Sequence, residues 1–146
     1  MGRRPRRDRG LGTRVFQWNC NGHPDQQWSV HLINPGSGAS ALYEVINQQS
    51  GRCLSISSYS RANGVQAVQL GCQDPTQGQS LWQVHPAGNG GYILQPAASR
   101  NADLSNSMCL DVRGAFSNDG VVLEQWTCNG GANQEFFFFG GALPTP

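Results

Sequence analysis

The sequence predicts an all-β domain of three repeats around a pseudo-threefold axis, and its composition and an internal period support that prediction. The chain has 146 residues, a length typical of one domain, and only 13% of them are charged. Its 19 Gly and 8 Pro interrupt helices too often for a helical bundle. Aromatic residues recur every 54 positions, at Trp28, Trp82 and Phe136. β repeats of this length favour a closed barrel with a shared core.

Within a repeat, the expected order is strand, tight turn, strand, Cys-bearing loop and strand. Alternating apolar residues predict the strands, and Asn-Gly or Asp-Gly between them is a strong hairpin signal. A further strand links each repeat to the next. The residues that carry these signals are Leu54, Ile56 and Asn63-Gly64 with the linking segment 43–51, and Leu110, Val112 and Asp119-Gly120 with the linking segment 91–99.

The first repeat differs from the others before Gly12, which occupies the position of Gly64 and Gly120. The residues MGRRPRRDR stand where a strand like the Cys-Leu-Asp-Val of the third repeat should be, so we expect the first repeat to lack its opening strand. Three repeats of 54 residues need 162 residues. The chain after residue 10 has 136, so the expected domain is 26 residues short. The expected boundaries are a basic disordered leader at 1–11, a domain at 12–141 with repeats at about 12–42, 43–90 and 91–141, and a tail at 142–146.

The charge distribution argues against a nucleic-acid partner and against a membrane span. All ten basic residues are Arg, six of them precede residue 15, and the chain from residue 15 onward has a net charge of −4. No basic stripe follows that cluster, as nucleic-acid binding would require. The longest apolar run, 136–139, is far shorter than the ~18 residues that cross a bilayer. No apolar segment of a secretion signal follows the arginines.

The five cysteines predict two disulfides and one free thiol. Cys53 and Cys72 are 19 residues apart, as are Cys109 and Cys128 at equivalent positions of the next repeat, so we expect each pair to be bonded and Cys20 to be free. No Cys-x-x-Cys or paired His spacing indicates a zinc site, and we expect no metal and no cofactor. Disulfides form in oxidising compartments, which favours a secreted protein.

These features together resemble the ricin-type β-trefoil lectins, which include carbohydrate-binding modules attached to many secreted glycoside hydrolases. The resemblance covers residues 12–141. It implies a trefoil in which Trp28, Trp82 and Phe136 pack as core residues near the threefold axis. The segments that carry it are the Q-x-W motif at Gln26-Gln27-Trp28, its variants at Ser80-Leu81-Trp82 and Gln134-Glu135-Phe136, Cys-Leu-Asp-Val at 109–112 and Trp-x-Cys-Asn-Gly at 126–130.

The resemblance also implies a sugar site in the third repeat. A sugar ring binds to an aromatic plate through its C–H face and to short polar side chains through its hydroxyls. By the resemblance, Trp126 is the plate, Asp111 accepts from two vicinal hydroxyls, and Asn133 both donates and accepts. Gln134 supports the loop. Glu124 shares a strand face with Trp126 and is a further candidate acceptor. An alternative reading of Trp126 is an exposed or packing tryptophan.

The other two repeats lack the full set of these residues. In the second, Ser55, Leu70 and Gln79-Ser80 replace the aspartate, the plate and the Asn-Gln pair, so no sugar site is expected there. One shallow site predicts a Kd of about 1 mM, so useful avidity would need other sites or a tethered partner. The first repeat keeps a partial site made of Trp18, Asp25 and Gln26.

The predicted function is the binding of a galactose- or xylose-containing glycan, or service as an accessory module with a tethered catalytic domain. Glycoside hydrolysis needs two carboxylates, one with a raised pKa. Asp111 and Glu124 are the one plausible pair, and we expect both in an open, shallow pocket with little to desolvate either acid, so we do not expect an enzyme. The alternative is a protein-interaction or structural trefoil with a relic sugar pocket.

Overall fold

Strands and short 3-10 helices supply the regular structure, and no α-helix occurs among the residues described. None of the helices in that part of the chain is long and apolar enough to cross a membrane. The expected boundaries near 11 and 142 and the place of the missing opening strand lie outside the residues described. The computed structural model describes residues 13–34, 41–56, 60–72, 78–101 and 105–138.

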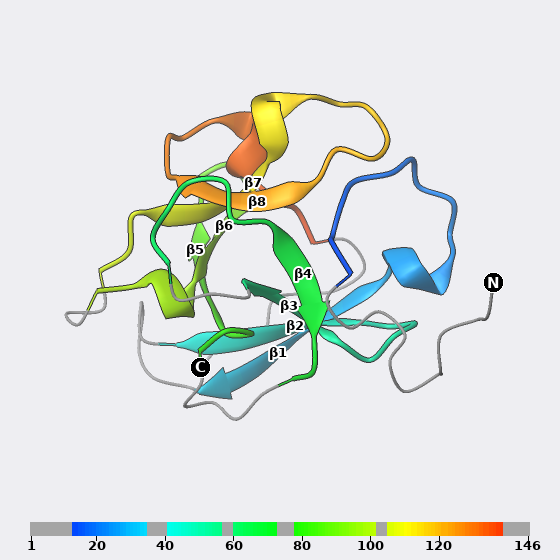
Figure 1. Ribbon diagram of the computed structural model, residues 1–146, viewed down its shortest axis with the longest axis horizontal. Coiled ribbons are helices and arrows are strands. Elements are labelled where there is room, and N and C mark those ends of the chain that lie inside the picture. Colours follow the sequence, from blue (N-terminus) through cyan, green and yellow to red (C-terminus); the bar gives the residue numbers. More distant parts are fainter. Residues whose placement is uncertain (1–12, 35–40, 57–59, 73–77, 102–104, 139–146) are drawn as a thin grey trace.

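The strands form antiparallel pairs that follow the order predicted from the repeats, which confirms the all-β prediction (Figure 1). β1 pairs with β2, β2 pairs with β3 and β5, and the pairs β3–β4, β5–β6 and β7–β8 complete the pattern. The elements are η2 (Pro24–Gln26), β1 (Trp28–Asn34), β2 (Leu42–Asn47), β3 (Cys53–Ile56), β4 (Ala67–Leu70), β5 (Trp82–Pro86), β6 (Tyr92–Pro96), η4 (Ala97–Ser99), β7 (Met108–Val112), η5 (Arg113–Ala115), β8 (Leu123–Thr127) and η6 (Ala132–Gln134).

The Asn-Gly and Asp-Gly dipeptides form turns, but they are not the tight hairpin loops that the sequence predicts. Residues 57–66 separate β3 from β4, and residues 113–122 separate β7 from β8. The turn glycines have positive φ angles, 91° at Gly64 and 85° at Gly120, which residues with a Cβ rarely adopt. Each turn lies at the end of a longer loop, and its Asn63 or Asp119 side chain bonds a neighbouring repeat.

β8 in the third repeat shows how these loops hold a strand. The Oδ1 atom of Asn63 accepts a hydrogen bond from the backbone nitrogen of Thr127 at 2.7 Å. The side chain of Gln125 is fully buried, and its Nε2 donates to the carbonyl oxygens of Ser60 and Ala62 at 2.9 and 2.8 Å. The loop of the second repeat therefore holds β8 of the third.

The segment 13–19 of the first repeat is held in the same way by the loop of the third. The Oδ1 atom of Asp119 accepts from the backbone nitrogen of Asn19 at 2.7 Å. Gln17 Nε2 donates to the carbonyl oxygens of Phe116 and Asn118 at 2.7 and 2.9 Å. Residues in register by sequence thus make equivalent contacts between successive repeats, as a pseudo-threefold arrangement requires.

The repeating aromatic residues share one hydrophobic core. Trp82 has no exposed surface, and its indole nitrogen donates to the carbonyl oxygen of Leu54 at 2.8 Å. Trp28 and Phe136 pack against the same cluster but remain partly exposed. The fully buried part of this cluster consists of Val45, Leu54, Ile56, Ala67, Trp82, Leu94 and Leu110.

Both predicted disulfides are confirmed. Cys53 bonds Cys72 and Cys109 bonds Cys128, each with a Cα–Cα distance of 5.1 Å. A loop of this length closed by a disulfide is stabilised by roughly 3 kcal/mol in the chain-entropy model. Cys20 is exposed and is not in a disulfide.

Replacement of Trp82 by Ala should lower the free energy of unfolding by about 3–5 kcal/mol, because it leaves a large cavity in the shared core. The matched control is Phe116→Ala, at a side chain that is 62% exposed, which should change stability by about 0.5 kcal/mol or less. Urea denaturation followed by circular dichroism measures both changes. Equal small losses in the two variants would contradict this description of the core.

Candidate functional site

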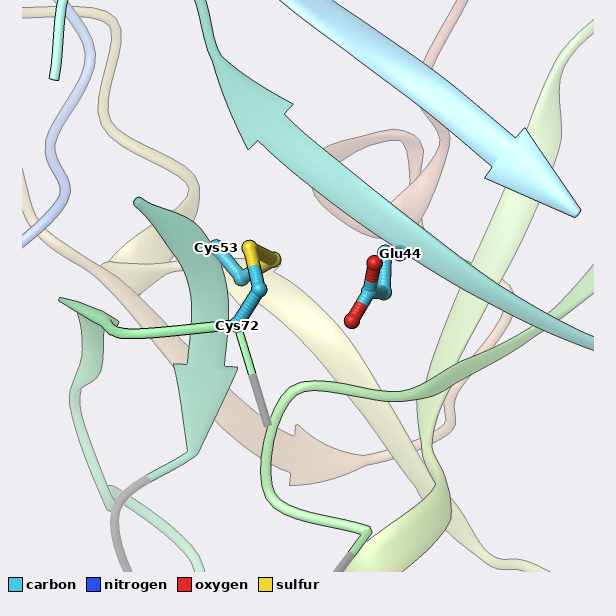
Figure 2. A group of neighbouring side chains, drawn as sticks. All are labelled: Glu44, Cys53 and Cys72. Atoms are coloured by element: carbon cyan, nitrogen blue, oxygen red, sulfur yellow. A yellow bond between two sulfur atoms is a disulfide. The ribbon is translucent and has the colours of Figure 1, made fainter. Parts of the chain in front are cut away.

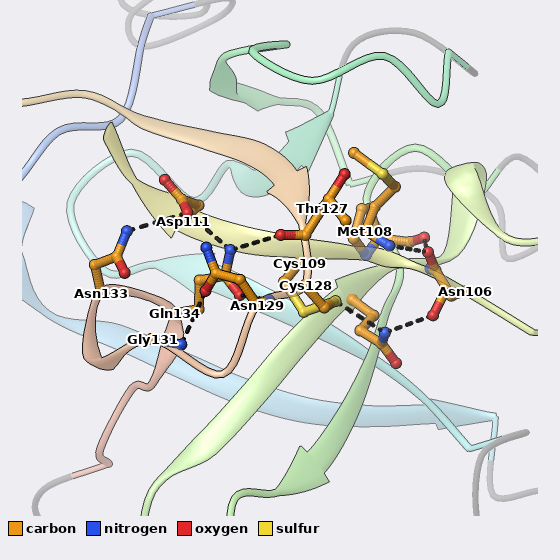
Figure 3. The surroundings of a disulfide bond; sticks show 12 residues. Asn106, Met108, Cys109, Asp111, Thr127, Cys128, Asn129, Gly131, Asn133 and Gln134 are labelled. Carbon is orange, nitrogen blue, oxygen red and sulfur yellow. Dashed lines mark hydrogen bonds between the residues drawn. A yellow bond between two sulfur atoms is a disulfide. The ribbon is translucent and has the colours of Figure 1, made fainter. Parts of the chain in front are cut away.

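The candidate site of the third repeat draws on β7, β8 and η6 beside the Cys109–Cys128 disulfide. Figure 3 shows the side chains of Asp111, Asn133 and Gln134 pointing toward one another next to that disulfide. The β7–β8 register places Asp111 opposite Glu124, and Cys109 opposite Trp126. Asp111 and Trp126 are therefore diagonal neighbours on one face of the hairpin, within the range of an aromatic side chain.

Gln134 connects the loop to both strands, and we call this arrangement the glutamine clamp. Its side chain is 1% exposed. Nε2 donates to Asp111 Oδ2 at 2.8 Å and to the carbonyl oxygen of Thr127 at 3.0 Å, while Oε1 accepts from the backbone nitrogen of Asn129 at 2.9 Å. A buried amide with its donors and acceptor bonded in this way fixes the atoms around it.

Asn133 uses both amide protons within the protein. Its Nδ2 donates to Asp111 Oδ2 at 3.1 Å and to the carbonyl oxygen of Val112 at 3.0 Å. An amide has two donor hydrogens, so the atom left to meet a hydroxyl is the acceptor Oδ1. Asp111 Oδ2 accepts from both Asn133 and Gln134, and Asp111 Oδ1 takes part in neither bond.

Trp126 is the exposed aromatic residue at this site. It is 40% exposed at the end of β8, so part of the indole faces solvent. An aromatic face that is partly open, beside acceptor oxygens, can stack on the C–H face of a ring while its hydroxyls donate to the oxygens.

Glu124 is buried, whereas the sequence predicts that its carboxylate accepts hydrogen bonds from a bound sugar. It is 2% exposed, and its Oε1 accepts from Arg113 Nε at 2.7 Å. Burial raises the pKa of Glu124, the Arg113 guanidinium opposes that rise, and the neighbouring Asp111 carboxyl adds to it. Asp111 is itself only 3% exposed. The expectation of an open pocket that desolvates neither acid is therefore wrong.

Arg113 is the residue of this group that the sequence reasoning missed. It follows β7 directly, and its Nη2 also donates to the carbonyl oxygen of Gly64 at 3.3 Å, which links the site to the second repeat. A usable signal was present, because an acid predicted to share a half-buried strand with an aromatic residue needs a cationic partner.

The first repeat contains the glutamine clamp without an aspartate. Gln26 Nε2 donates to the carbonyl oxygen of Asn19 at 2.8 Å, and its Oε1 accepts from the backbone nitrogen of Asn21 at 2.7 Å. Among the residues described, no carboxylate bonds Gln26. Trp18 is 55% exposed and Asp25 is exposed on η2, and both line one groove with Gln26.

The second repeat has neither the clamp nor the plate. Ser55 is fully buried, and its hydroxyl donates to the carbonyl oxygen of Cys53 at 3.0 Å. Ser80, which replaces the clamp glutamine, is also buried. Leu70 is partly buried and pairs with Cys53 in the β3–β4 ladder.

One cluster in the described part of the chain has the spacing of a metal site, and its chemistry does not fit one. Glu44 lies beside Cys53 and Cys72, but the two sulfur atoms bond each other (Figure 2). Metal ligation needs a thiolate, which a disulfide does not supply. Burial raises the pKa of Glu44, while His31 lowers it.

Replacement of Glu124 by Gln tests the burial of this carboxyl. Because the folded-state pKa of Glu124 is raised, its favourable contribution is present at low pH and is lost as the pH rises through that value. The unfolding free energy of the wild type should therefore fall relative to that of Glu124→Gln as the pH rises from about 4, the ordinary pKa of a glutamate, through the raised folded-state value. Urea denaturation across this range measures the difference, and a constant difference or a relative gain by the wild type would contradict the assignment.

Three solved structures are similar to this chain in fold. The chain is 26% identical to the designed threefold-symmetric protein ThreeFoil, with a TM-score of 0.72 over 87% of this chain and 81% of that one. It is also 26% identical to part of an exo-β-1,3-galactanase from Clostridium thermocellum, with a TM-score of 0.67 over 85% of this chain and 24% of the galactanase. The Rhizoctonia solani agglutinin has a TM-score of 0.70 at 19% identity, over 89% of this chain and 81% of that chain.

The family comparison agrees with the fold and with the resemblance read from the repeats. Among curated proteins, none matches the chain. The model of the ricin-type beta-trefoil lectin domain-like family matches residues 24–107, which is more than half of the chain. Domains of this family are typically non-catalytic binding modules. With its trefoil arrangement, its repeated aromatic residues and this match, the chain belongs to the ricin-type β-trefoil lectin-like family.

Proposed function

We propose that the domain at 12–141 binds carbohydrate through Asp111, Trp126 and Asn133, with Gln134 and Glu124 as supporting residues. The observation that carries this proposal is the convergence of two acceptor side chains, held by the glutamine clamp, on the hairpin face that also bears the exposed Trp126. Sugar hydroxyls would donate to Asp111 and to Asn133 Oδ1, while the indole would cover the ring.

The ligand that we propose is a galactose- or xylose-containing glycan. Membership in a lectin-like family supports a carbohydrate ligand in general. The likeness to part of a galactanase favours galactose over xylose in that ligand. Because this chain spans about a quarter of that enzyme, we also propose that it can serve as an accessory module beside a tethered catalytic domain. The two disulfides support secretion to an oxidising compartment.

The proposed role is binding without catalysis. Asp111 and Glu124 do form a close pair, but Glu124 is in an ion pair with Arg113 and has almost no exposed surface. A general acid must meet the leaving-group oxygen directly or through one water. Glu124 Oε1 already accepts from Arg113 Nε at 2.7 Å, which does not fit that requirement.

Affinity chromatography tests the proposed site. The wild type should be retarded on immobilised galactose or on xylan, and free sugar should abolish the delay, with a Kd of about 1 mM. Trp126→Ala should weaken binding about tenfold or more, because it removes the stacking face. Trp18→Ala is the matched control, at the equivalent position of the first repeat, and should bind as the wild type does.

Two outcomes would overturn the binding proposal. The absence of any delay on both resins would favour the protein-interaction trefoil, and a delay that Trp126→Ala leaves unchanged would show that sugar binds elsewhere on the protein. Turnover of an aryl glycoside that is lost in Asp111→Asn would show an enzyme instead.

A further inference from the structure

The segment Arg14–Trp18 of the first repeat is paired along one edge. The backbone nitrogen of Val15 donates to the carbonyl oxygen of Ala67 at 2.9 Å, and that of Gln17 donates to the carbonyl oxygen of Val121 at 2.9 Å. Val15 also accepts from the nitrogen of Leu123 at 2.8 Å. These bonds join the segment to the second and third repeats and hold it extended.

The other edge of this segment is open. Backbone groups of successive residues in a strand point to opposite edges, so those of Arg14, Phe16 and Trp18 point away from the bonds just described. None of these backbone groups bonds any residue in the described part of the chain. Phe16 and Trp18 are 48% and 55% exposed, and their rings meet edge to face with centroids 6.2 Å apart.

The third repeat shows what normally covers such an edge. There, the residues equivalent to Phe16 and Trp18 are Glu124 and Trp126, and both pair with β7. β7 lies between β8 and η6, and it contacts both. The clamp residue Gln134 donates from η6 to Asp111 on β7.

In the first repeat, a groove of about 580 Å³ occupies the corresponding place. One wall is the open edge, and the other is η2 with the clamp residue Gln26 and the repeating aromatic Trp28. The amide of Gln26 bonds the carbonyl of Asn19 as that of Gln134 bonds the carbonyl of Thr127, and in the third repeat Gln134 also bonds the covering strand at Asp111. The groove therefore has the walls of a strand site.

A free thiol also lines this groove. Cys20 occupies the position of Cys128, which is bonded to Cys109 on β7, and that of Cys72, which is bonded to Cys53 on β3. Cys20 is exposed and lines the groove. In both complete repeats, the covering strand thus carries a cysteine that bonds the residue equivalent to Cys20.

We propose that this groove binds an extended strand of a partner polypeptide with the pattern Cys-apolar-x-apolar, in addition to the sugar site of the third repeat. The strand adds antiparallel to the open edge, with its cysteine opposite Trp18 and its third residue opposite Phe16, as Cys109 and Asp111 stand opposite Trp126 and Glu124. The segments 109–112 and 53–56, which cover the equivalent edges of the third and second repeats, both have this pattern.

Thiol–disulfide exchange would then fix the bound strand. The thiolate of Cys20 attacks the sulfur of a partner cysteine that is held as a mixed disulfide with glutathione. A new sulfur–sulfur bond forms to Cys20, the bond to glutathione breaks, and glutathione leaves as a thiolate that takes a proton. Cys20 is oxidised, the glutathione sulfur is reduced, and no further oxidant is needed.

The test uses the full chain and a synthetic peptide with the sequence of residues 107–114, SMCLDVRG, as its glutathione mixed disulfide. Mass spectrometry follows the rate of adduct formation. The peptide should be captured at least tenfold faster than a scrambled peptide with the same cysteine, because strand pairing aligns the reacting sulfur atoms. Cys20→Ser should form no adduct.

Backbone methylation separates strand pairing from simple thiol reactivity. An N-methyl group at the peptide's aspartate removes a donor that faces Phe16, so capture should slow to the rate of the scrambled peptide. The matched control has the N-methyl group at the peptide's leucine, whose nitrogen points to the opposite edge, and should keep the fast rate.

The outcomes distinguish this proposal from the proposed function. Equal capture rates for the native and scrambled peptides, or for the two methylated peptides, would overturn the strand site. Sugar retardation does not depend on Cys20, so Cys20→Ser should still bind the galactose or xylan resin. Loss of sugar binding in Trp126→Ala leaves the expected peptide capture unchanged.

Discussion

Each repeat contains a strand whose two edges both need partners, and the architecture depends on meeting that requirement. In the third repeat, Gln125 and its neighbours bond the second repeat along one edge, and β7 covers the other. In the first repeat, Val15 and Gln17 bond the neighbouring repeats in the same way, so the barrel closes even where no covering strand lies on the outer edge among the residues described. An unpaired edge is a template for another strand.

The same requirement places the candidate sugar site. Pairing of β7 with β8 brings Asp111 under the loop, and the glutamine clamp then fixes Asp111 and Asn133 together. In the first repeat, Gln26 makes the clamp bonds but has no aspartate partner among the residues described. In the second repeat, the buried Ser80 stands at the clamp position and neither the clamp nor the aspartate is present. One scaffold thus has a repeat with both covering strand and clamp, a repeat with the clamp alone and a repeat with the covering strand alone, because covering strand and clamp vary independently.

Much of the fold could be predicted because it repeats in the sequence. The 54-residue period identified Trp82 as an equivalent of Trp28, and the equal spacing of the cysteines gave both disulfides. The contacts between repeats could not be predicted in this way, since Asn63 bonds Thr127 across 64 residues. The Asn-Gly turn therefore serves a contact between repeats at the end of a long loop, which a local hairpin signal does not reveal.

The candidate site was predictable in its residues but not in its burial. Asp111, Asn133 and Gln134 meet as the motifs imply, whereas Glu124 lies inward against Arg113. Strand alternation places Glu124 and Trp126 on one face, but it does not say how much of that face a loop covers. The arginine that neutralises Glu124 comes from η5; the half-buried acid implied a cationic partner, but no sequence pattern indicated which residue supplies it.

The central claim is that a sugar contacts Trp126 and Asn133. Titration of the ¹⁵N-labelled chain with galactose or xylose, followed by two-dimensional NMR, reports each tryptophan indole and each side-chain amide separately. The account predicts saturable shifts at the indole of Trp126 and at the Asn133 amide, with the indole of Trp18 unchanged. Shifts confined to Trp18, or no saturable shift at Trp126 with either sugar, would contradict it.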